Sequence, residues 1–224
     1  MSFEPEAVRS FEHAGWQRAA ANYGNTFAQA TARFIEALLK AAEISPGQHV
    51  LDAACGPGDL AAAASARGAT AHGLDFSAEM VGIARSNHPE VVVAEGDAED
   101  LPYSDSVFDA VVSSFGIHHV PRPELALARC WRVLKPGGRA VSLEITSPRT
   151  PIWRDLFAIY FDHAMPRIGG WLSGRPDAYR YLPQSVHDFL PPEQVVDVMR
   201  SAGLHDVYFR RWALGSMAVY VGTK

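Results

Sequence analysis

The sequence predicts an α/β protein built on a doubly wound, mostly parallel sheet of seven strands that closes with an antiparallel hairpin. Three observations predict this fold. Short apolar runs alternate with helical segments between residues 49 and 145, which is typical of a parallel sheet covered by helices on both faces. A glycine-rich turn at 55–58 directly follows the first apolar run. Only a short turn separates the last two runs, 205–212 and 216–221, so we expect those strands to pair in antiparallel.

The strands are predicted from short apolar runs that are bounded by turn residues. The first run leads into the glycine-rich turn, and the second ends in Asp75. The segment 135–138, with its proline and two glycines, turns the chain into the fifth strand. The seven predicted strands are 49–53, 69–75, 91–94, 107–113, 139–145, 205–212 and 216–221.

The helices are predicted from apolar periodicity and from the residues at their ends. Apolar residues recur at helical spacing from Phe27 to Ala42. Ser77 is a typical N-cap, and Pro123 is suited to a first helical turn. Gly68 and Gly203 lie where a helix would end. The five predicted helices are 27–42, 59–66, 77–87, 123–134 and 192–202.

The composition is that of an ordinary globular chain and excludes several function classes. Apolar residues make up 48% and charged residues 20% of the 224, and the net charge of −5 lacks the basic surface of a nucleic-acid-binding protein. Cys55 and Cys130 have no paired spacing, which indicates a reducing compartment. Since there is neither a signal peptide nor an apolar run of the ~18 residues that a membrane span needs, we expect a cytoplasmic small-molecule enzyme without integral membrane association.

The turn at 55–58 predicts a ligand site at the end of the first strand. Gly56 and Gly58, with Pro57 between them, let a ligand approach the backbone where a Cβ would block it. The next helix points its free N–H groups at the same place. Gly56, Gly58 and Ala61 also have the spacing of a dinucleotide-binding fingerprint, so the turn alone leaves the nucleotide open.

Three acidic residues narrow the choice of nucleotide. Asp75 ends the second strand, where a carboxylate can bind both hydroxyls of a ribose. Asp97 follows the third strand, where it can accept from an adenine amino group while the Ala98 N–H donates to the ring. Asp52 lies in the first strand, where it would repel a pyrophosphate but suits a ligand that carries an ammonium and a sulfonium. The set therefore favours an adenosyl amino acid.

Two apolar side chains complete the expected nucleotide site, because Phe76 and Met80 are placed to cover an adenine ring. A dinucleotide-dependent reductase would also need a tyrosine and a lysine four positions apart on a helix. Tyr220 and Lys224 have that spacing but lie on the last predicted strand. The reductase interpretation is therefore set aside.

Several segments resemble known methyltransferases. Residues 51–58, 73–80, 96–102, 108–109 and 132–138 resemble class I S-adenosylmethionine-dependent methyltransferases. Residues 157–160, 165–169 and 177–185, with Phe189, resemble the ubiquinone/menaquinone C-methyltransferase (UbiE-type) family. The resemblance covers about 48–224 and implies a Rossmann-like fold, S-adenosylmethionine as the cofactor, and methyl transfer as the activity. It also implies that Ala54 and Ser114 lie beside the cofactor.

Two positions differ from the usual residues of that family. Ala54 stands where the cofactor loop usually has its first glycine, a small change that still permits binding. Quinone-methylating members usually carry Arg-Asn after the Phe-Gly of the fourth strand, whereas this chain has His118-His119. The second difference points away from a quinone acceptor and leaves the cofactor unaffected.

His118 and His119 are candidate bases because they follow the fourth strand, at the edge of the sheet where ligands bind. A histidine, which titrates near neutral pH, can remove the proton of a phenol, enol or hydroquinone. The alternative is that both only hydrogen-bond the loop backbone. Adjacent side chains point in different directions, so no metal site is expected here. Tyr23 is a third candidate that could close over the cofactor or acceptor, with plain packing as its alternative.

Residues 147–190 interrupt the alternation of strands and helices. They include eight aromatic residues, about 18% of the segment against 10% for the whole chain, which predicts an apolar lid over a flat acceptor. Asp162 and His163 form a second candidate acid–base pair, and the alternative for the aromatic residues is an extra helical layer. The candidate acceptor-binding residues are Tyr160, His163, Tyr179 and Tyr181.

We expect a single domain of four parts. An N-terminal helical segment covers 1–45, and the core that binds the cofactor covers 46–146. The aromatic lid covers 147–190, and a C-terminal helix and hairpin cover 191–224.

The main functional hypothesis is a methyltransferase of specialised metabolism that acts on C or O of a small apolar aromatic or polyketide-like acceptor. The first alternative is a C-methyltransferase of the menaquinone or ubiquinone pathway, which could touch a membrane surface to reach its acceptor. A remote alternative is a protein that binds S-adenosylmethionine without transferring methyl, as a cyclase or sensor. The oligomeric state stays open, with a homodimer among the options.

Overall fold

The computed structural model describes Arg9, residues 27–164, Val186 and residues 189–224. Within these residues the chain forms a seven-stranded sheet. Its strands begin and end within two residues of the predicted positions for all but one. They are β1 (His49–Ala53), β2 (Thr70–Asp75), β3 (Val92–Glu95), β4 (Phe108–Ser114), β5 (Leu134–Ile145), β6 (His205–Trp212) and β7 (Met217–Thr223).

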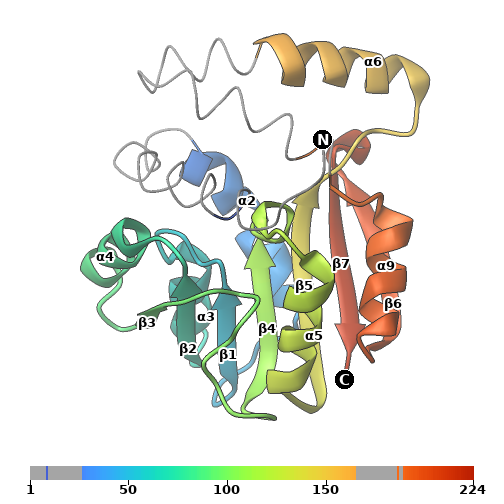
Figure 1. Cartoon of the computed structure of the whole chain (residues 1–224). Helices are drawn as coiled ribbons and strands as arrows, with labels where there is room; N and C mark the ends of the chain where they lie inside the picture. Colours follow the sequence, from blue (N-terminus) through green and yellow to red (C-terminus); the bar gives the residue numbers. More distant parts are fainter. Residues whose placement is uncertain (1–8, 10–26, 165–185, 187–188) are drawn as a thin grey trace.

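The order of the strands confirms the predicted architecture. The sheet runs β3-β2-β1-β4-β5-β7-β6 (Figure 1). The first five strands are parallel to one another, and β7 lies antiparallel between β5 and β6. The chain order therefore reverses between β1 and β4, which is the place where open sheets of this kind bind ligands.

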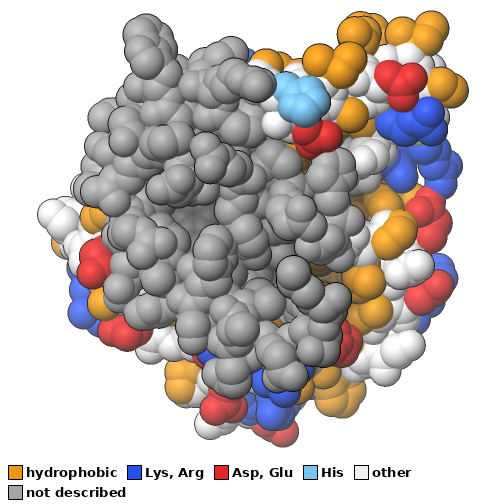
Figure 2. Space-filling view, turned by 45° about the horizontal axis from the view of Figure 1, so that its top comes forward, with side chains coloured by type: hydrophobic (Ala, Val, Ile, Leu, Met, Phe, Trp, Pro, Cys, Tyr) orange, Lys and Arg blue, Asp and Glu red, His pale blue; other side chains and the backbone are white. Residues whose placement is uncertain are grey.

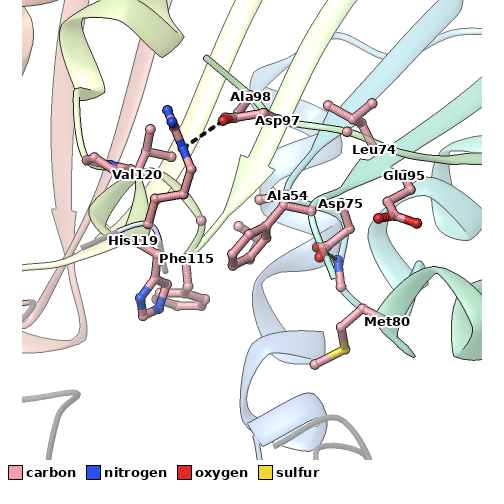
Figure 3. A pocket seen from close by; sticks show the side chains of 17 residues that line it. Ala54, Leu74, Asp75, Met80, Glu95, Asp97, Ala98, Phe115, His119 and Val120 are labelled. Carbon is pink, nitrogen blue, oxygen red and sulfur yellow. Dashed lines mark hydrogen bonds and ion pairs between the residues drawn. The ribbon is translucent and has the colours of Figure 1, made fainter. Parts of the chain in front are cut away.

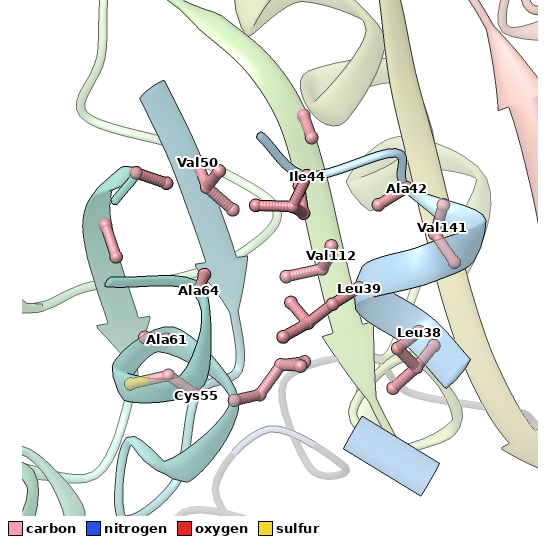
Figure 4. Close-up of a cluster of buried hydrophobic side chains, with 14 of the residues drawn as sticks. Leu38, Leu39, Ala42, Ile44, Val50, Cys55, Ala61, Ala64, Val112 and Val141 are labelled. Carbon is pink, nitrogen blue, oxygen red and sulfur yellow. The ribbon is translucent and has the colours of Figure 1, made fainter. Parts of the chain in front are cut away.

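Three helices cover one face of the sheet: α2 (Phe27–Ala41), α3 (Asp59–Ala66) and α4 (Ala78–Asn87). From α2, the fully buried Leu38 and Leu39 point at Val112 and Val141 on the sheet (Figure 4). Val50 of β1 belongs to the same apolar layer. The apolar residues whose helical spacing predicted α2 therefore lie on the side of the helix that faces the sheet.

Two helices cover the other face: α5 (Pro123–Val133) and α9 (Pro192–Ser201). Cys130 from α5 and Met199 from α9 pack in one buried layer with Leu51 and Tyr220 of the sheet. Since both faces are covered, neighbouring strand residues such as Val50 and Leu51 are both buried, which explains why the strands read as short apolar runs.

One strand begins earlier than expected. β5 starts at Leu134 instead of residue 139, because Leu134 pairs with Phe108 before the ladder to β4 shifts register and resumes at Arg139. The predicted turn at 135–138 therefore lies inside the strand as an irregularity.

Helix α6 (Pro151–Ile159) and a π-helical turn (Tyr160–Ala164) lie beyond the end of the sheet toward which β4 points (Figure 1). Phe161 is buried against Ile145 and the partly buried Phe115, which ties this segment to the sheet. Much of the outer side of α6 is apolar and exposed, and Figure 2 shows hydrophobic side chains over this helix. The rest of the predicted lid, 165–185 and 187–188, lies outside the described residues.

In the part of the chain that the structure describes, every helix is too short or too polar to cross a bilayer.

Candidate functional site

A cavity of about 540 Å³ opens at the carboxyl ends of the parallel strands, where the strand order reverses. His119 and Phe115 lie on one side of it, and Asp75, Met80 and Glu95 lie on the other (Figure 3). The cavity brings together eight of the predicted cofactor residues: Ala54, Gly56, Asp75, Phe76, Met80, Asp97, Ala98 and Ser114.

The turn after β1 forms one wall of the cavity because its backbone takes left-handed conformations. Gly56 has a φ of 52°, and a Cβ added there would meet nothing within 4 Å. Ala54 has a φ of 61°, a conformation that is unfavourable by about 1–2 kcal/mol for a residue with a side chain. This strain explains physically why a glycine suits position 54 better than an alanine.

Gly58 and Pro57 do not line the cavity. Gly58 begins α3 with a φ of 89°, and a Cβ there would come within 3.1 Å of Ala84 and 3.3 Å of His88. Gly58 therefore allows α3 and α4 to pack closely, which differs from the close approach of a ligand that the sequence suggested.

Asp75 connects the glycine turn to the next loop. Its Oδ2 accepts a hydrogen bond of 2.8 Å from the Gly56 N–H, and its Oδ1 accepts one of 3.0 Å from the Ser77 N–H. Burial raises the pKa of Asp75, and these backbone donors and His119 offset part of that rise. The carboxylate thus has a fixed orientation at the cavity wall with lone pairs left for further donors.

Asp52 is buried, and it does not line the cavity. Neither carboxylate oxygen has a hydrogen-bond partner within the described residues. Burial raises the pKa of Asp52 well above its usual range, the Ala61 N–H nearby lowers it somewhat, and Asp75 and Asp59 raise it further. A buried carboxylate of this kind is stabilised by a neighbouring cation.

Asp97 lines the cavity beside Ala98, and its Oδ1 accepts a hydrogen bond of 2.8 Å from the Glu99 N–H. Its Oδ2 lies 3.1 Å from the Arg9 Nε, an ion pair that sequence reasoning missed (Figure 3). Arg9 also pairs with Glu99, which in turn binds Arg122 at 2.7 Å. Arg9 is far from Asp97 in the sequence and belongs to no recognisable motif, so nothing in the sequence indicated this contact.

Apolar side chains complete the same side of the cavity. Met80 is fully buried, and Phe76 and Leu74 line the cavity with it. The Ser77 Oγ accepts a hydrogen bond of 3.3 Å from the Met80 N–H, so the predicted N-cap fixes the start of α4 and with it the position of Met80.

The two histidines after β4 have different surroundings. They lie in a short 3-10 turn (Ile117–His119), where His119 lines the cavity and His118 does not. His118 is buried, and its Nδ1 lies 2.5 Å from the Glu144 Oε2. Phe115, with a φ of 57°, and Val120 also line the cavity and were missed by sequence reasoning, because they have no polar group to draw attention to them.

The other candidate residues are not part of this cavity as far as the structure describes it. Tyr160 is 53% exposed and His163 is exposed, and neither lines the cavity. Tyr23, Tyr179 and Tyr181 lie outside the described residues.

The residues at the cavity fit an adenosyl ligand with a positive charge. Asp75 offers a fixed carboxylate to ribose hydroxyls, and Met80 with Phe76 offers apolar surface to a purine. Glu95 adds negative charge to the same cavity, where Asp97 is paired with Arg9, and Asp52 is a buried carboxylate without a hydrogen-bond partner among the described residues. This acidic set disfavours a pyrophosphate and suits a sulfonium and an ammonium.

Comparisons with known proteins agree with this chemistry. Residues 31–224 match the model of the ubiE/COQ5 methyltransferase family. A demethylmenaquinone methyltransferase of Deinococcus radiodurans is 38% identical, over 94% of this chain and 82% of that protein. A demethylmenaquinone methyltransferase of Thermus thermophilus is 40% identical, over 79% of this chain and 83% of that protein.

The fold has close neighbours among solved structures. An S-adenosylmethionine-dependent methyltransferase of Thermotoga maritima, described as a possible histamine N-methyltransferase, superposes with a TM-score of 0.66 at 22% identity. The superposition covers 94% of this chain and 99% of that one. With the family match over most of its length, this chain belongs to the ubiE/COQ5 methyltransferase family and is an S-adenosylmethionine-dependent methyltransferase.

Proposed function

We propose that this enzyme methylates a ring carbon of a demethylated quinol of the menaquinone type. The names of its relatives support this acceptor, and they give no support to the specialised-metabolism acceptor that the sequence first suggested. The observation that carries the proposal is the cavity itself: an acidic side suited to the cofactor faces an apolar side formed by Phe115 and Val120, with His119 among them.

We assign each side of the cavity a task in the reaction. Bound S-adenosylmethionine supplies the methyl group, as the cofactor does the chemistry in enzymes of this kind. Asp75, Asp97 and Ala98 hold the adenosyl part, with the turn at 54–56 against it. Alignment of donor and acceptor can then contribute up to ~7–11 kcal/mol.

His119 is the base in this proposal. A quinol hydroxyl must lose its proton for electron density to rise at the neighbouring ring carbon, and histidine is a suitable acceptor for that proton. His119 lines the cavity, whereas His118 is buried behind it. We therefore assign the proton transfer to His119 and a supporting position to His118.

Helix α6 gives the acceptor an apolar approach. Its exposed side chains include Ile152, at 72%, and Ile159, at 61%, and Phe161 connects the segment to Phe115 at the cavity. Trp153 and Leu156 on the same helix are exposed as well. An exposed apolar patch, unlike a single exposed apolar residue, marks an interaction site, and surface of this kind suits the hydrocarbon tail of a membrane-dissolved quinol.

The test is turnover of defined acceptors by the purified enzyme with isotopically labelled S-adenosylmethionine. Demethylmenaquinol, kept reduced with dithionite, is compared with a phenolic polyketide of similar size, and the product is located by mass spectrometry and NMR. Methylation of the quinol ring carbon supports the proposal. Turnover of the polyketide alone contradicts it and favours the specialised acceptor, for which the His118-His119 pair is the supporting observation. The Asp75→Ala variant is the control for cofactor-dependent turnover.

A further inference from the structure

Glu144 is a buried carboxylate on β5 that no part of the proposed reaction yet uses. Its side chain is 1% exposed, as is that of His118. The Glu144 Oε1 accepts hydrogen bonds from the Ile117 N–H, at 2.9 Å, and from the Ser142 hydroxyl, at 3.0 Å. Its Oε2 lies 2.5 Å from the His118 Nδ1. Glu144 therefore connects the end of the sheet to the turn that carries both histidines.

The chemistry of this contact fixes the His118 ring. A carboxylate is an acceptor only, so the proton between the two groups belongs to the His118 Nδ1, which donates to Glu144. A short hydrogen bond to a charged acceptor is also among the stronger ones in proteins. Both the tautomer and the orientation of the ring are thus determined by Glu144.

The fixed ring then contacts His119. The centroids of the two imidazoles are 3.9 Å apart, and their planes are inclined by 41°. His119 is the one of the two that lines the cavity. We propose that Glu144 is a positioning residue that holds the His119 imidazole toward the acceptor through the adjacent, tilted ring of His118. This inference rests on the proposed function, in which His119 receives the acceptor proton.

Other titratable groups lie close to Glu144, His118 and His119, and a test must leave them unchanged. Asp75 on β2 interacts electrostatically with His119 from across the cavity. Tyr220 on β7 lies near Glu144; burial chiefly, and then Glu144, raise the pKa of its hydroxyl. Glu144 also supports the backbone through the Ile117 N–H, so loss of activity alone would not separate positioning from folding.

The first test is the Glu144→Gln variant, read by ¹⁵N NMR of the histidine rings. The glutamine oxygen must keep the Ile117 N–H and the Ser142 hydroxyl as donors, so its amide group faces the His118 Nδ1 and donates to it. His118 must then change from the Nδ1–H to the Nε2–H tautomer, and the signals of His119 shift with it. His118→Asn assigns the signals, and Glu36→Gln, which changes an exposed glutamate on α2, is the matched control.

The second test is kinetic. We expect His119→Ala to lower kcat by about 10²–10⁴, as for loss of a general base. We expect Glu144→Gln to lower kcat by about 10–100-fold with the KM for S-adenosylmethionine unchanged, as for loss of a group that orients another. In the His119→Ala background, Glu144→Gln should add no further loss, because both changes act on one step.

Each outcome decides one claim. A full additional loss in the double variant, or unchanged His119 signals in Glu144→Gln, overturns the positioning role. If the wild type does not turn over demethylmenaquinol, the proposed function fails, while the tautomer change and the shift of His119 still decide whether Glu144 orients it. If Glu144→Gln does not fold, His118→Asn takes its place. It keeps a donor toward Glu144 but removes the ring that contacts His119, and an unchanged kcat in that variant contradicts the proposal.

Discussion

The two sides of the cavity are built in different ways. On the side that we propose for the cofactor, backbone groups fix two of the side chains: Asp75 is held by two N–H donors of neighbouring loops, and Met80 by the N-cap of its helix. On the side that we propose for the acceptor, side chains fix one another: Glu144 holds His118, and the His118 ring lies against that of His119. A backbone N–H is present whatever side chain its residue carries, whereas a contact between side chains is lost when either residue is substituted. We therefore expect substitutions on the two sides to differ in kind.

The largest expected effect separates the sides most clearly. Asp75→Ala removes the fixed carboxylate from the cofactor side, along with its bonds to Gly56 and Ser77. Loss of two charge-assisted hydrogen bonds to a ligand corresponds to about 3 kcal/mol, or roughly 100-fold in affinity. Titration calorimetry measures the affinity of the variant for S-adenosylmethionine, and His119→Ala is the control on the acceptor side. Affinities within threefold of each other in the two variants would contradict the division.

The boundary between the sides is expected to tolerate little added volume. A Cβ at Gly116 would lie 2.6 Å from the Ala54 Cβ and 2.8 Å from the Ser113 Oγ. Gly116→Ala should therefore lower the free energy of unfolding by about 1–3 kcal/mol, since such overlap forces the backbone to move. Gly82→Ala is the matched control: nothing lies within 4 Å of its Cβ position in α4, and it should raise stability by about 0.5–1 kcal/mol. Urea unfolding measures the free energy of unfolding of both variants. If both substitutions change it in the same direction, the packing around Gly116 is looser than the structure indicates.

A smaller effect should show that the cofactor side is built for binding at the expense of stability. The folded protein raises the pKa of Asp52, so it holds that proton more tightly than the unfolded chain does. Stability is therefore lost as pH rises from about 4 toward the raised pKa. Asp52→Asn removes this loss and should stabilise the protein by on the order of 1 kcal/mol at pH 7, with no gain below pH 4. Calorimetry should show that Asp52→Asn binds the cofactor more weakly. If Asp52→Asn is less stable than the wild type at pH 7, the expected link between the raised pKa and stability is wrong.

The smallest effect is expected at the surface of the acceptor side. Tyr160 is 53% exposed and makes no wall of the cavity. Tyr160→Ala should leave the affinity for S-adenosylmethionine and the free energy of unfolding within the usual range of surface changes, about 0.5 kcal/mol. A rise in the KM for the quinol alone would place Tyr160 on the acceptor path. Weaker cofactor binding would show that the two sides are not separate.

The separation in sequence between contacting residues explains how far the sequence could predict the molecule. Strand ends, the glycine turn and the N-cap at Ser77 are local patterns, so the fold and eight of the cavity residues could be read directly. The contacts of Arg9 and Glu144 join residues that lie far apart in the chain, and no spacing rule connects them. Glu144 reads as one polar residue in a buried strand, and only the fold shows that it faces His118.

The role of Gly58 could not be predicted for a related reason. Its place in the motif indicated contact with a ligand, but its missing side chain leaves room for Ala84 and His88 instead. A glycine pattern tells where the backbone needs space, and only the structure tells what occupies that space.

The position of β7 between β5 and β6 has a consequence for the nascent chain. The inner edge of β5, residues 139–145, pairs with 217–223, which the ribosome makes much later. Until then β5 presents unpaired backbone groups, and an uncovered edge of this kind can pair with other chains. Long-range pairing of this sort is also slow to form. The hazard of aggregation during synthesis therefore depends on how soon the C-terminal hairpin docks, and variants that weaken β7 should lower the yield of protein before they affect its cofactor site.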